Sequence, residues 1–343
     1  MVNNEGYIQL NDLSVGYETG RQQRTVIPKI NLRASQGNLI ALVGANGSGK
    51  STLLRTLAGI QSPIKGSISI DNKPIESYSR HDLAEKLSFV GTHYDMHAMM
   101  RVHQVVSYGR YPYTNILGHL HPTDKMIIRK AMHDTGIFHL RDAFISEISD
   151  GEKQRVLIAR SLAQDTNIIL LDEPTAFLDV KNKFEILHLL GRLAHEKRKI
   201  ILFSSHDLQI VLGTADLLWF IDHKKIIQGL PEEMVLKNTI NELFRHSEVY
   251  FDAENNEFRI QRRHNFCVRL LGSGALYKWT ERALDRLHIK VDNRCSGPAI
   301  HIEQKDQEIV WTVNPDNKGD EFFALQDLIQ HLHSKYGNSK QLR

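Results

Sequence analysis

GANGSGKST, residues 44–52, follows the apolar run Asn38–Val43 (NLIALV). The run predicts a buried strand, and the loop matches G-x-x-x-x-G-K-[ST], a pattern that leads from a strand into a helix and binds nucleotide phosphates. Glycine N–H groups and the helix N-terminus stabilise anionic phosphates. Lys50 is placed to reach the β- and γ-phosphates, and Ser51 offers a hydroxyl to Mg²⁺. The predicted nucleotide-binding residues are Gly44, Ala45, Asn46, Gly47, Ser48, Gly49, Lys50, Ser51 and Thr52.

A second apolar run, Ile168–Leu171, ends in the carboxylates Asp172 and Glu173. Open α/β sheets bind ligands at the carboxyl ends of their strands. Asp172 suits the Mg²⁺ shell. Glu173 can polarise an attacking water, which hydrolysis requires because water is a poor nucleophile. The alternative is an acidic strand end at the surface, but the phosphate loop earlier in the chain favours the functional interpretation.

The composition indicates a folded protein of two domains. The chain has 343 residues, 41% of them hydrophobic and 24% charged, which excludes a disordered or fibrous protein. A net charge of +3 is too small to indicate nucleic acid as a partner. The two cysteines, Cys267 and Cys295, fit a reducing compartment and are expected to be buried apolar fillers. We expect neither a secretion signal nor a membrane-spanning helix.

The order of predicted elements indicates a larger first domain, residues 1–240, and a smaller one, residues 248–343. Alternating residues over 7–32 predict antiparallel strands with one wet face, and the all-apolar strands further on predict a parallel sheet covered by helices. A helical subdomain is expected at about 80–160. Helix 182–197 is expected to bury a stripe that includes Phe184, and a hairpin is expected around Asp222-His223.

The segment Ser149-Asp-Gly-Glu152 precedes a predicted helix and has two interpretations. Ser149 with Glu152 three positions later is a capping box, which satisfies the N–H groups at a helix start without any ligand. The same helix end can also face a phosphate.

Several motifs together resemble the ATP-binding cassette (ABC) ATPases. GANGSGKST, ISDGEKQR, ILLDEP, FLD and the His206 of SSHD occur in the order and spacing of that family, over roughly residues 7–238. The resemblance implies a P-loop cassette with a parallel core sheet, an antiparallel β subdomain and a helical subdomain, followed here by a small α+β domain. It also implies an enzyme that hydrolyses ATP with Mg²⁺.

The resemblance carries roles over to individual residues. Tyr17 is similar to the aromatic residue that stacks on adenine. Residues 44–52 are similar to the Walker A motif, in which Lys50 is one of the catalytic residues. Asp172 is similar to the Walker B aspartate, and Glu173 is similar to the catalytic base that follows it. His206 is similar to the switch histidine near the γ-phosphate. Asp179 corresponds to the D-loop. In this family two cassettes pair head to tail, so the signature residues Ser149, Asp150, Gly151 and Glu152 are expected to act on the partner's ATP.

Two positions depart from the family pattern. Asp150 replaces the first signature glycine, and we expect its carboxylate to point away as a helix-start residue. Thr92 stands where the Q-loop glutamine is expected, after the strand Leu87–Val90. Its hydroxyl can touch Mg²⁺ or a water but is shorter, so hydrolysis is expected to be slower and to survive.

Gly109-Arg-Tyr-Pro112 resembles the GRxP segment of cassettes that serve importers of iron-siderophores, haem and vitamin B12, although Pro112 also reads simply as a helix stop. The resemblance implies an ATPase subunit that powers uptake of a metal chelate or cobalamin through a separate permease, at the cytoplasmic face of the plasma membrane. A substrate-binding protein is an indirect partner. Residues 92–100 are expected to contact the permease. The alternative is an ATP-binding regulator with little or no hydrolysis.

Two other classes of ABC protein do not fit the sequence. A DNA-repair ABC protein carries a long heptad insertion, and residues 53–148 have none. A tandem translation factor repeats the P-loop. The tail from residue 248 is expected to end in a helix over 321–335, and we hypothesise that it regulates the cassette or docks the permease. Gly272-Ser-Gly274 reads as a tight turn in preference to an anion pocket.

Overall fold

The computed structural model forms two compact units, Met1–Leu243 with Ala253–Glu257, and Phe244–Asp252 with Phe258–Arg343. The structure describes residues 7–20, 22–92, 97–115, 118–245, 247–305, 308–314 and 319–336. Among the described residues, no helix has the length and apolar character needed to cross a bilayer.

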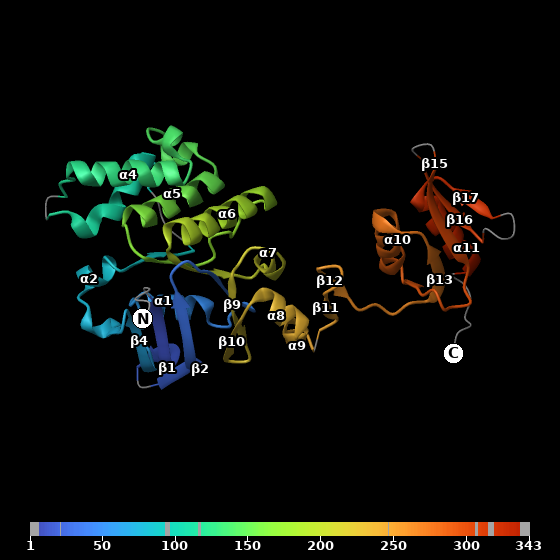
Figure 1. The fold of residues 1–343 in the computed structure, drawn as a ribbon, viewed down its shortest axis with the longest axis horizontal. Helices are drawn as coiled ribbons and strands as arrows, with labels where there is room; N and C mark the ends of the chain where they lie inside the picture. The colour runs from blue at the N-terminus through green and yellow to red at the C-terminus, as the bar shows by residue number, and fades with distance from the viewer. Residues whose placement is uncertain are drawn as a thin grey trace, which may run out of the picture. The chain divides into compact units, whose positions relative to one another are not determined.

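A mostly parallel sheet forms the centre of the first unit, with the strand order β10-β9-β3-β8-β7-β6. Its strands β9 and β10 are labelled in Figure 1. Its strands are β3 (Leu39–Gly44), β6 (Leu87–Val90), β7 (Ile168–Leu171), β8 (Ile200–Ser205), β9 (Leu217–Asp222) and β10 (Lys225–Gly229). Neighbouring strands are parallel except for the predicted β9–β10 hairpin. Every residue of β7 and β8 is buried, as expected for strands covered on both faces. The carboxyl ends of β3, β7 and β8 therefore meet at one edge.

Helices cover both faces of this sheet. α1 (Lys50–Leu57) packs on the face that carries Ile40 and Leu42. α6 (Val180–Lys197) packs on the opposite face, where Leu39 contacts Gly191. The other short helices outside the inserted region are η1 (Ile75–Ser77), α2 (Arg80–Ala84), α7 (Leu208–Leu212), α8 (Pro231–Leu236) and α9 (Thr239–Leu243).

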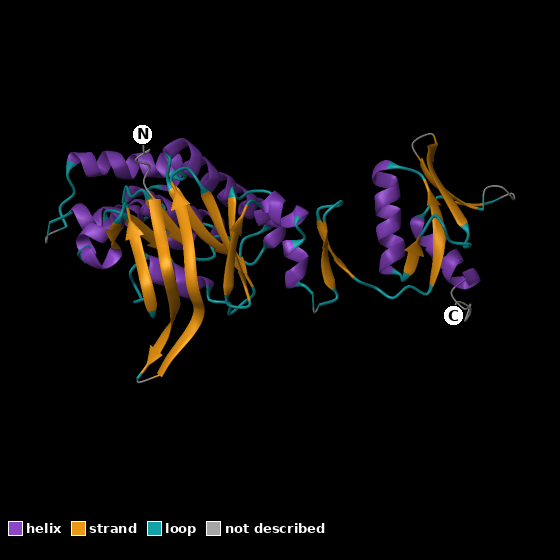
Figure 2. Ribbon diagram, turned by 60° about the horizontal axis from the view of Figure 1, so that its bottom comes forward, coloured by secondary structure: helices purple, strands orange, loops and turns teal. Residues whose placement is uncertain are grey.

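A four-stranded antiparallel sheet, in the order β2-β1-β4-β5, shares its core with α1. Its strands are β1 (Tyr7–Thr19), β2 (Gln22–Ser35), β4 (Lys65–Ile70) and β5 (Lys73–Pro74). The long β1–β2 hairpin is visible in Figure 2. Leu53 and Leu57 of α1 are fully buried between the two sheets, together with Leu10 and Ile68. Thus α1, which begins in the phosphate loop, is anchored on both sides.

A helical region lies between β6 and β7. It contains α3 (Val102–Ser107), η2 (Tyr108–Tyr113), α4 (Pro122–Asp134), η3 (Phe138–Leu140), η4 (Ile145–Glu147) and α5 (Asp150–Ala163). A Cβ on Gly109 would lie 2.1 Å from the carbonyl oxygen of Arg160, so η2 and α5 touch through their backbones. Buried Arg110 pairs with Asp124 at 2.8 Å and donates to the Ala163 carbonyl at 3.0 Å. The GRYP segment therefore fastens the helices of this region together.

The second unit contains a five-stranded sheet in the order β14-β13-β15-β16-β17 and a separate β11–β12 pair. Its elements are β11 (Val249–Asp252), β12 (Glu257–Ile260), β13 (Phe266–Leu271), α10 (Gly274–Arg286), β14 (Ile289–Val291), β15 (Ala299–Lys305), β16 (Glu308–Val313), β17 (Asp320–Phe322) and α11 (Leu325–Tyr336). Both helices pack on one face of the sheet, around Leu284, Ile300 and Leu328.

The predicted fold class is confirmed, and two local expectations are wrong. The final helix was expected over 321–335, but 320–322 form β17, where Phe322 pairs with Trp311 of β16, and the helix begins at Leu325. Pairing with the preceding strand β16 overrides the local helical pattern there. Phe184 is 49% exposed, because α6 starts at the carboxyl edge of the sheet and its buried stripe begins at Ile186.

Candidate nucleotide-binding site

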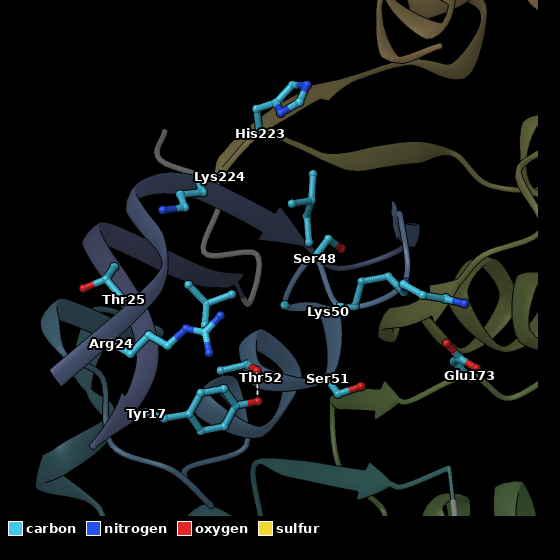
Figure 3. A pocket seen from close by; sticks show the side chains of 15 residues that line it. Tyr17, Arg24, Thr25, Ser48, Lys50, Ser51, Thr52, Glu173, His223 and Lys224 are labelled. Atoms are coloured by element: carbon cyan, nitrogen blue, oxygen red, sulfur yellow. Dashed lines mark hydrogen bonds between the residues drawn. The ribbon is translucent and has the colours of Figure 1, made fainter. Parts of the chain in front are cut away.

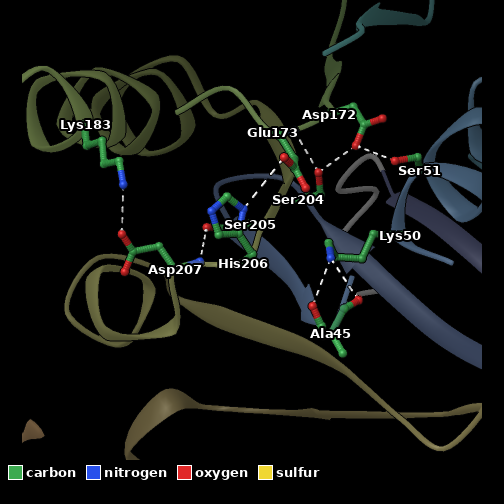
Figure 4. Close-up of polar contacts among 11 residues, drawn as sticks. Ala45, Lys50, Ser51, Asp172, Glu173, Lys183, Ser204, Ser205, His206 and Asp207 are labelled. Atoms are coloured by element: carbon green, nitrogen blue, oxygen red, sulfur yellow. Dashed lines mark hydrogen bonds and ion pairs between the residues drawn. The ribbon is translucent and has the colours of Figure 1, made fainter. Parts of the chain in front are cut away.

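The predicted phosphate loop connects β3 to α1. Gly49 precedes the helix with φ 107°, a left-handed conformation, and a Cβ there would lie 2.7 Å from the Val26 side chain. Only glycine fits this position. Lys50 is buried, and its Nζ donates to the carbonyls of Gly44 at 2.9 Å and Ala45 at 3.2 Å, so the side chain folds back across the loop (Figure 4).

Polar donors at this loop suit an anion. The N-cap residue of α1 is Gly49, and the described residues show no side-chain cap at this position. The Ser48 Oγ is buried and has no hydrogen-bond partner among the described residues. A buried polar atom without a partner is unfavourable unless a ligand supplies one. The loop therefore fits a polyphosphate, and the Ser48 hydroxyl is a candidate donor to it.

Asp172 lies at the carboxyl end of β7 and is 2% exposed. Its Oδ1 accepts from the Ser51 Oγ at 3.0 Å and from the Ser204 Oγ at 2.7 Å (Figure 4). The Ser204 Oγ also accepts from the backbone N–H of Glu173 at 2.7 Å. The structure thus brings together Ser51 and Asp172, and it adds Ser204, which we did not predict. A hydroxyl at the end of the buried strand β8 was the available signal.

The paired oxygens of Ser51 and Asp172 suit a hard divalent cation such as Mg²⁺, which uses few protein ligands and completes its shell with phosphate and water. No cluster of three or more His, Cys, Asp or Glu that could hold a metal occurs within the described ranges. Burial lowers the pKa of Lys50, and the nearby Glu173 and Asp172 carboxylates oppose that shift. The site therefore places one cation and two carboxylates in a poorly solvated region.

Glu173 and His206 lie side by side. The His206 Nδ1 is 3.7 Å from the Glu173 Oε2. Glu173 has φ 51°, a strained conformation for a non-glycine residue, and its N–H bond to Ser204 helps to hold it. The residue after the histidine is also fixed, because Asp207 pairs with Lys183 of α6 at 3.1 Å.

A cavity of about 560 Å³ extends from the phosphate loop to Tyr17 (Figure 3). Tyr17 is 47% exposed, and its OH lies 2.5 Å from the Thr52 Oγ1. The cavity is lined by Tyr17, Arg24, Thr25, Val26, Asn46, Gly47, Ser48, Gly49, Lys50, Ser51, Thr52, Glu173, Ile221, His223 and Lys224. Arg24 and Lys224 were not predicted. Arg24 lies opposite Tyr17 in the β1–β2 register, which local sequence does not reveal.

The signature segment forms the capping box. Ser149 Oγ accepts from the Glu152 N–H at 3.4 Å, and Glu152 accepts from the Ser149 N–H at 2.8 Å. The Ser149 hydroxyl also donates to the Glu152 carboxylate at 2.8 Å, and the bonds that this carboxylate accepts from the Ser149 N–H and hydroxyl lower the pKa of Glu152. Asp150 pairs with Lys153 at 2.9 Å. Residues 149–152 are absent from the described lining of the cavity. Asp179, the predicted D-loop residue, caps α6 by accepting from the Asn182 N–H at 2.7 Å.

Thr92 follows β6 by two residues and is half-buried. The Asp172 N–H donates to the Val90 carbonyl at 2.8 Å, so Thr92 and Asp172 emerge from neighbouring strands at the same edge. The permease-contact segment expected at 92–100 lies partly outside the described residues, since positions 93–96 are not among them.

Comparisons with known proteins agree with this geometry. The family described as ABC transporter matches residues 27–176, and the family described as iron ABC transporter C-terminal domain matches residues 265–333. An uncharacterised ABC transporter ATP-binding protein of Methanocaldococcus jannaschii is 36% identical over 277 residues, which is 78% of this chain and 94% of the relative. The petrobactin import ATP-binding protein FpuD of Bacillus anthracis is 36% identical over 221 residues, which is 64% of this chain and 81% of the relative.

A dimeric solved structure of a bacterial ABC transporter cassette superimposes with a TM-score of 0.57 at 23% identity, covering 65% of this chain and 98% of that one. At this identity the likeness concerns the fold. The family predicted from the motifs is confirmed. The chain belongs to the ATP-binding proteins of ABC transporters, in the group that carries the iron ABC transporter C-terminal domain.

Proposed function

We propose that this chain is the ATP-hydrolysing subunit of an importer that takes up an iron-siderophore or a related metal chelate through a separate permease. The observation that carries the proposal is the cluster of Lys50, Ser51, Asp172 and Glu173 at one edge of the sheet, in a chain that also contains the iron transporter C-terminal domain. Petrobactin, a substrate named for one relative, supports the siderophore class.

ATP lies along the cavity in this proposal. Tyr17 stacks on adenine, the N–H groups of residues 44–52 bind the phosphates, and Lys50 turns from the loop carbonyls to the β- and γ-phosphates. Ser51 and Asp172 hold Mg²⁺, with Thr92 beside them at the same edge of the sheet. When bound, that ion neutralises charge on the phosphate oxygens.

Hydrolysis depends on Glu173 and His206. The Glu173 carboxylate orients a water and accepts its proton, while His206, close to that carboxylate, donates to the γ-phosphate. The Ser204 hydroxyl donates to the Asp172 carboxylate and accepts from the backbone N–H of Glu173. These two bonds hold Asp172 and Glu173 in fixed positions relative to each other. Thr92 reaches less far than a glutamine, so turnover is slow but not absent.

Two copies of the chain complete the site. The signature residues 149–152 lie outside the cavity of their own chain, which supports their action on ATP bound by the partner, with Asp179 at the interface. ATP then closes the dimer and its hydrolysis reopens it.

The permease is the membrane partner, and the chain works from the cytoplasmic face without binding nucleic acid. A cavity of about 330 Å³ near the end of β6 supports a docking position for a short permease helix, and its described lining includes Phe89, Tyr108 and Tyr111. Tyr111 is 77% exposed. A substrate-binding protein delivers the chelate to the far side of the permease. The C-terminal unit regulates the cassette or docks the permease, and deletion of residues 248–343 tests this by its effect on uptake.

ATP hydrolysis by the wild type and by Glu173→Gln tests the central proposal. We expect wild-type turnover with Mg²⁺ and a loss of about 10²–10⁴-fold in the variant, with ATP binding retained. Uptake of a ferric siderophore by cells that carry the permease should stop in the same variant. A wild type that binds ATP and never hydrolyses it, even with its permease, would establish the alternative of an ATP-binding regulator, which Asp150 and Thr92 favour.

A further inference from the structure

The cysteines of the chain differ from the prediction. Cys267 and Cys295 are the only two in the sequence, and both were expected to be buried fillers. Both are half-buried instead. Cys267 lies on β13, and Cys295 lies in the segment between β14 and β15, so both belong to the C-terminal unit.

The segment that carries Cys295 is fastened to β13 on both sides of the cysteine. The Asp292 N–H donates to the Val268 carbonyl at 2.9 Å, and the Arg269 N–H donates to the Pro298 carbonyl at 2.9 Å. Within the segment, the Cys295 N–H donates to the Asp292 carbonyl at 3.0 Å. These backbone bonds hold Cys295 next to the strand of Cys267.

A glycine permits this close approach. A Cβ on Gly297 would lie 2.0 Å from the Cys267 carbonyl oxygen and 3.3 Å from the Cys295 Sγ. The Cys295 thiol therefore lies beside the backbone of Cys267. A disulfide requires two side chains already directed at each other, because a mismatch stores strain. The backbone bonds on both sides of Cys295 and the close approach at Gly297 hold the two cysteines in neighbouring positions, which is the first condition for closing such a bond.

We propose that Cys267 and Cys295 form a reversible intramolecular disulfide with a small-molecule disulfide as the oxidant. The Cys295 thiolate attacks the oxidant, forming a mixed disulfide and releasing one thiol. The Cys267 sulfur then attacks the Cys295 sulfur, which closes the protein disulfide and releases the second thiol. The protein loses two electrons and two protons, and the oxidant gains both.

The environment assigns the order of attack. Burial, together with the neighbouring Cys295, raises the pKa of Cys267. The Cys267 thiol therefore keeps its proton more firmly and reacts second, once Cys295 carries a leaving group. A metal is a poorer fit for this pair, because the described residues around it do not form a group of three ligands.

Equilibration of the full-length chain with mixtures of reduced and oxidised glutathione tests the proposal. Free thiols are trapped with iodoacetamide and the chain is digested without reduction for mass spectrometry. We expect a Cys267–Cys295 linked peptide pair about 2 Da lighter than the two free-thiol peptides, fully reversed by dithiothreitol. The equilibrium constant for ring closure should be at least about tenfold larger in the folded chain than in guanidinium, because the fold holds the thiols together.

Cys295→Ser and Cys267→Ser are the matched controls. Each should leave one cysteine that stops at the mixed disulfide with glutathione. Equal equilibrium constants in the folded and unfolded chains would overturn the proposal. So would a wild type that keeps glutathione on both cysteines without closing the ring, or disulfides formed only between chains.

Discussion

Helices α1 and α5 both begin at a segment assigned to phosphate, and they satisfy their N-terminal N–H groups in opposite ways. α1 starts after Gly49, without a side-chain cap and without an acidic residue in its first turn. α5 starts after Ser149, with a complete capping box and with Asp150 and Glu152 in its first turn. A helix N-terminus attracts anions, so added carboxylates weaken that attraction for a ligand.

The difference separates a permanent binding site from a conditional one. Within the described part of the chain, the N-terminus of α1 has no side-chain cap that would compete with a ligand, and Lys50 adds a buried positive charge. The capping box of α5 accounts for the N–H groups of Ser149 and Glu152 and leaves those of Asp150 and Gly151 outside it. We therefore expect α1 to hold nucleotide alone and α5 to contribute only when a second chain presents its phosphates.

Among the variants that test this comparison of helix ends, the largest effect is expected for Lys50→Ala, which removes the cation at the start of α1. ATP hydrolysis should fall by about 10²–10³-fold, because the charge that stabilises the phosphates is lost. Thermal stability should stay the same or rise, since the side chain is buried and its ionised form is disfavoured there. A coupled ATPase assay and a thermal melt measure the two quantities.

Lys224→Ala is the matched control, because it removes an equal charge from the exposed wall of the same cavity. Its effect on hydrolysis should be under about tenfold, as expected for a screened surface charge. Equal losses in the two variants would contradict the special place of Lys50 at the start of α1.

Ser204→Ala should have the next largest effect. The change removes a donor to Asp172 and leaves the partly buried N–H of Glu173 without its acceptor. The free energy of unfolding should fall by about 1–3 kcal/mol, and hydrolysis should fall by about tenfold as the carboxylates lose their fixed positions. Urea unfolding and turnover at saturating ATP measure both.

The neighbouring Ser205→Ala is the control for Ser204. Ser205 is equally well buried, but its Oγ accepts from the Asp207 N–H and bonds to neither carboxylate. It should lose stability with little loss of turnover. If both variants hydrolyse ATP equally slowly, Ser204 has no particular role in positioning the carboxylates.

Contiguous motifs explain how much of the site was predictable. The phosphate loop and the Asp172-Glu173 pair each lie in one segment after a buried strand, so local sequence fixes their chemistry and their position. Ser204 reaches the site because its strand pairs with β3, which is distant in sequence. Arg24 reaches it through the register of the β1–β2 hairpin, which the alternation of residues does not specify.

The fold shows the same division. Strands of the parallel sheet were predicted because complete burial leaves an unmistakable apolar run. In the C-terminal unit, β17 was missed because its three residues are a strand only through pairing with β16. The neighbouring positions of Cys267 and Cys295 were missed for the same reason, since backbone bonds between a strand and a later turn bring them together.

Asp150→Gly tests whether the carboxylate at the start of α5 weakens the attraction of this helix end for phosphate. Removing the carboxylate should make this helix end more attractive to phosphate, so hydrolysis by the dimer should rise by about 2–5-fold at low salt. Stability should change little, because the lost ion pair with Lys153 is solvent-exposed. Lys153→Ala breaks the same pair while keeping the negative charge, and a similar rise in that variant would contradict the explanation.

Ser149→Ala tests whether α5 satisfies its own donors, and its effect is the smallest. Loss of the cap should lower the free energy of unfolding by about 1 kcal/mol at neutral pH. Urea unfolding, followed through the transition of the unit that contains α5, measures this difference at several pH values.

The pH dependence carries a definite sign. Because bonds to Ser149 lower the folded-state pKa of Glu152 below its ordinary 4.5, this stabilisation is complete above 4.5 and is lost as the pH falls through the lowered pKa. The variant lacks the serine hydroxyl bond, so the stability difference between wild type and Ser149→Ala should narrow in acid. In a Glu152→Gln background, where position 152 cannot titrate, the same serine change should have an effect that is independent of pH. If the difference in unfolding free energy between the wild type and Ser149→Ala stays constant with pH, the serine hydroxyl does not stabilise the charged form of Glu152.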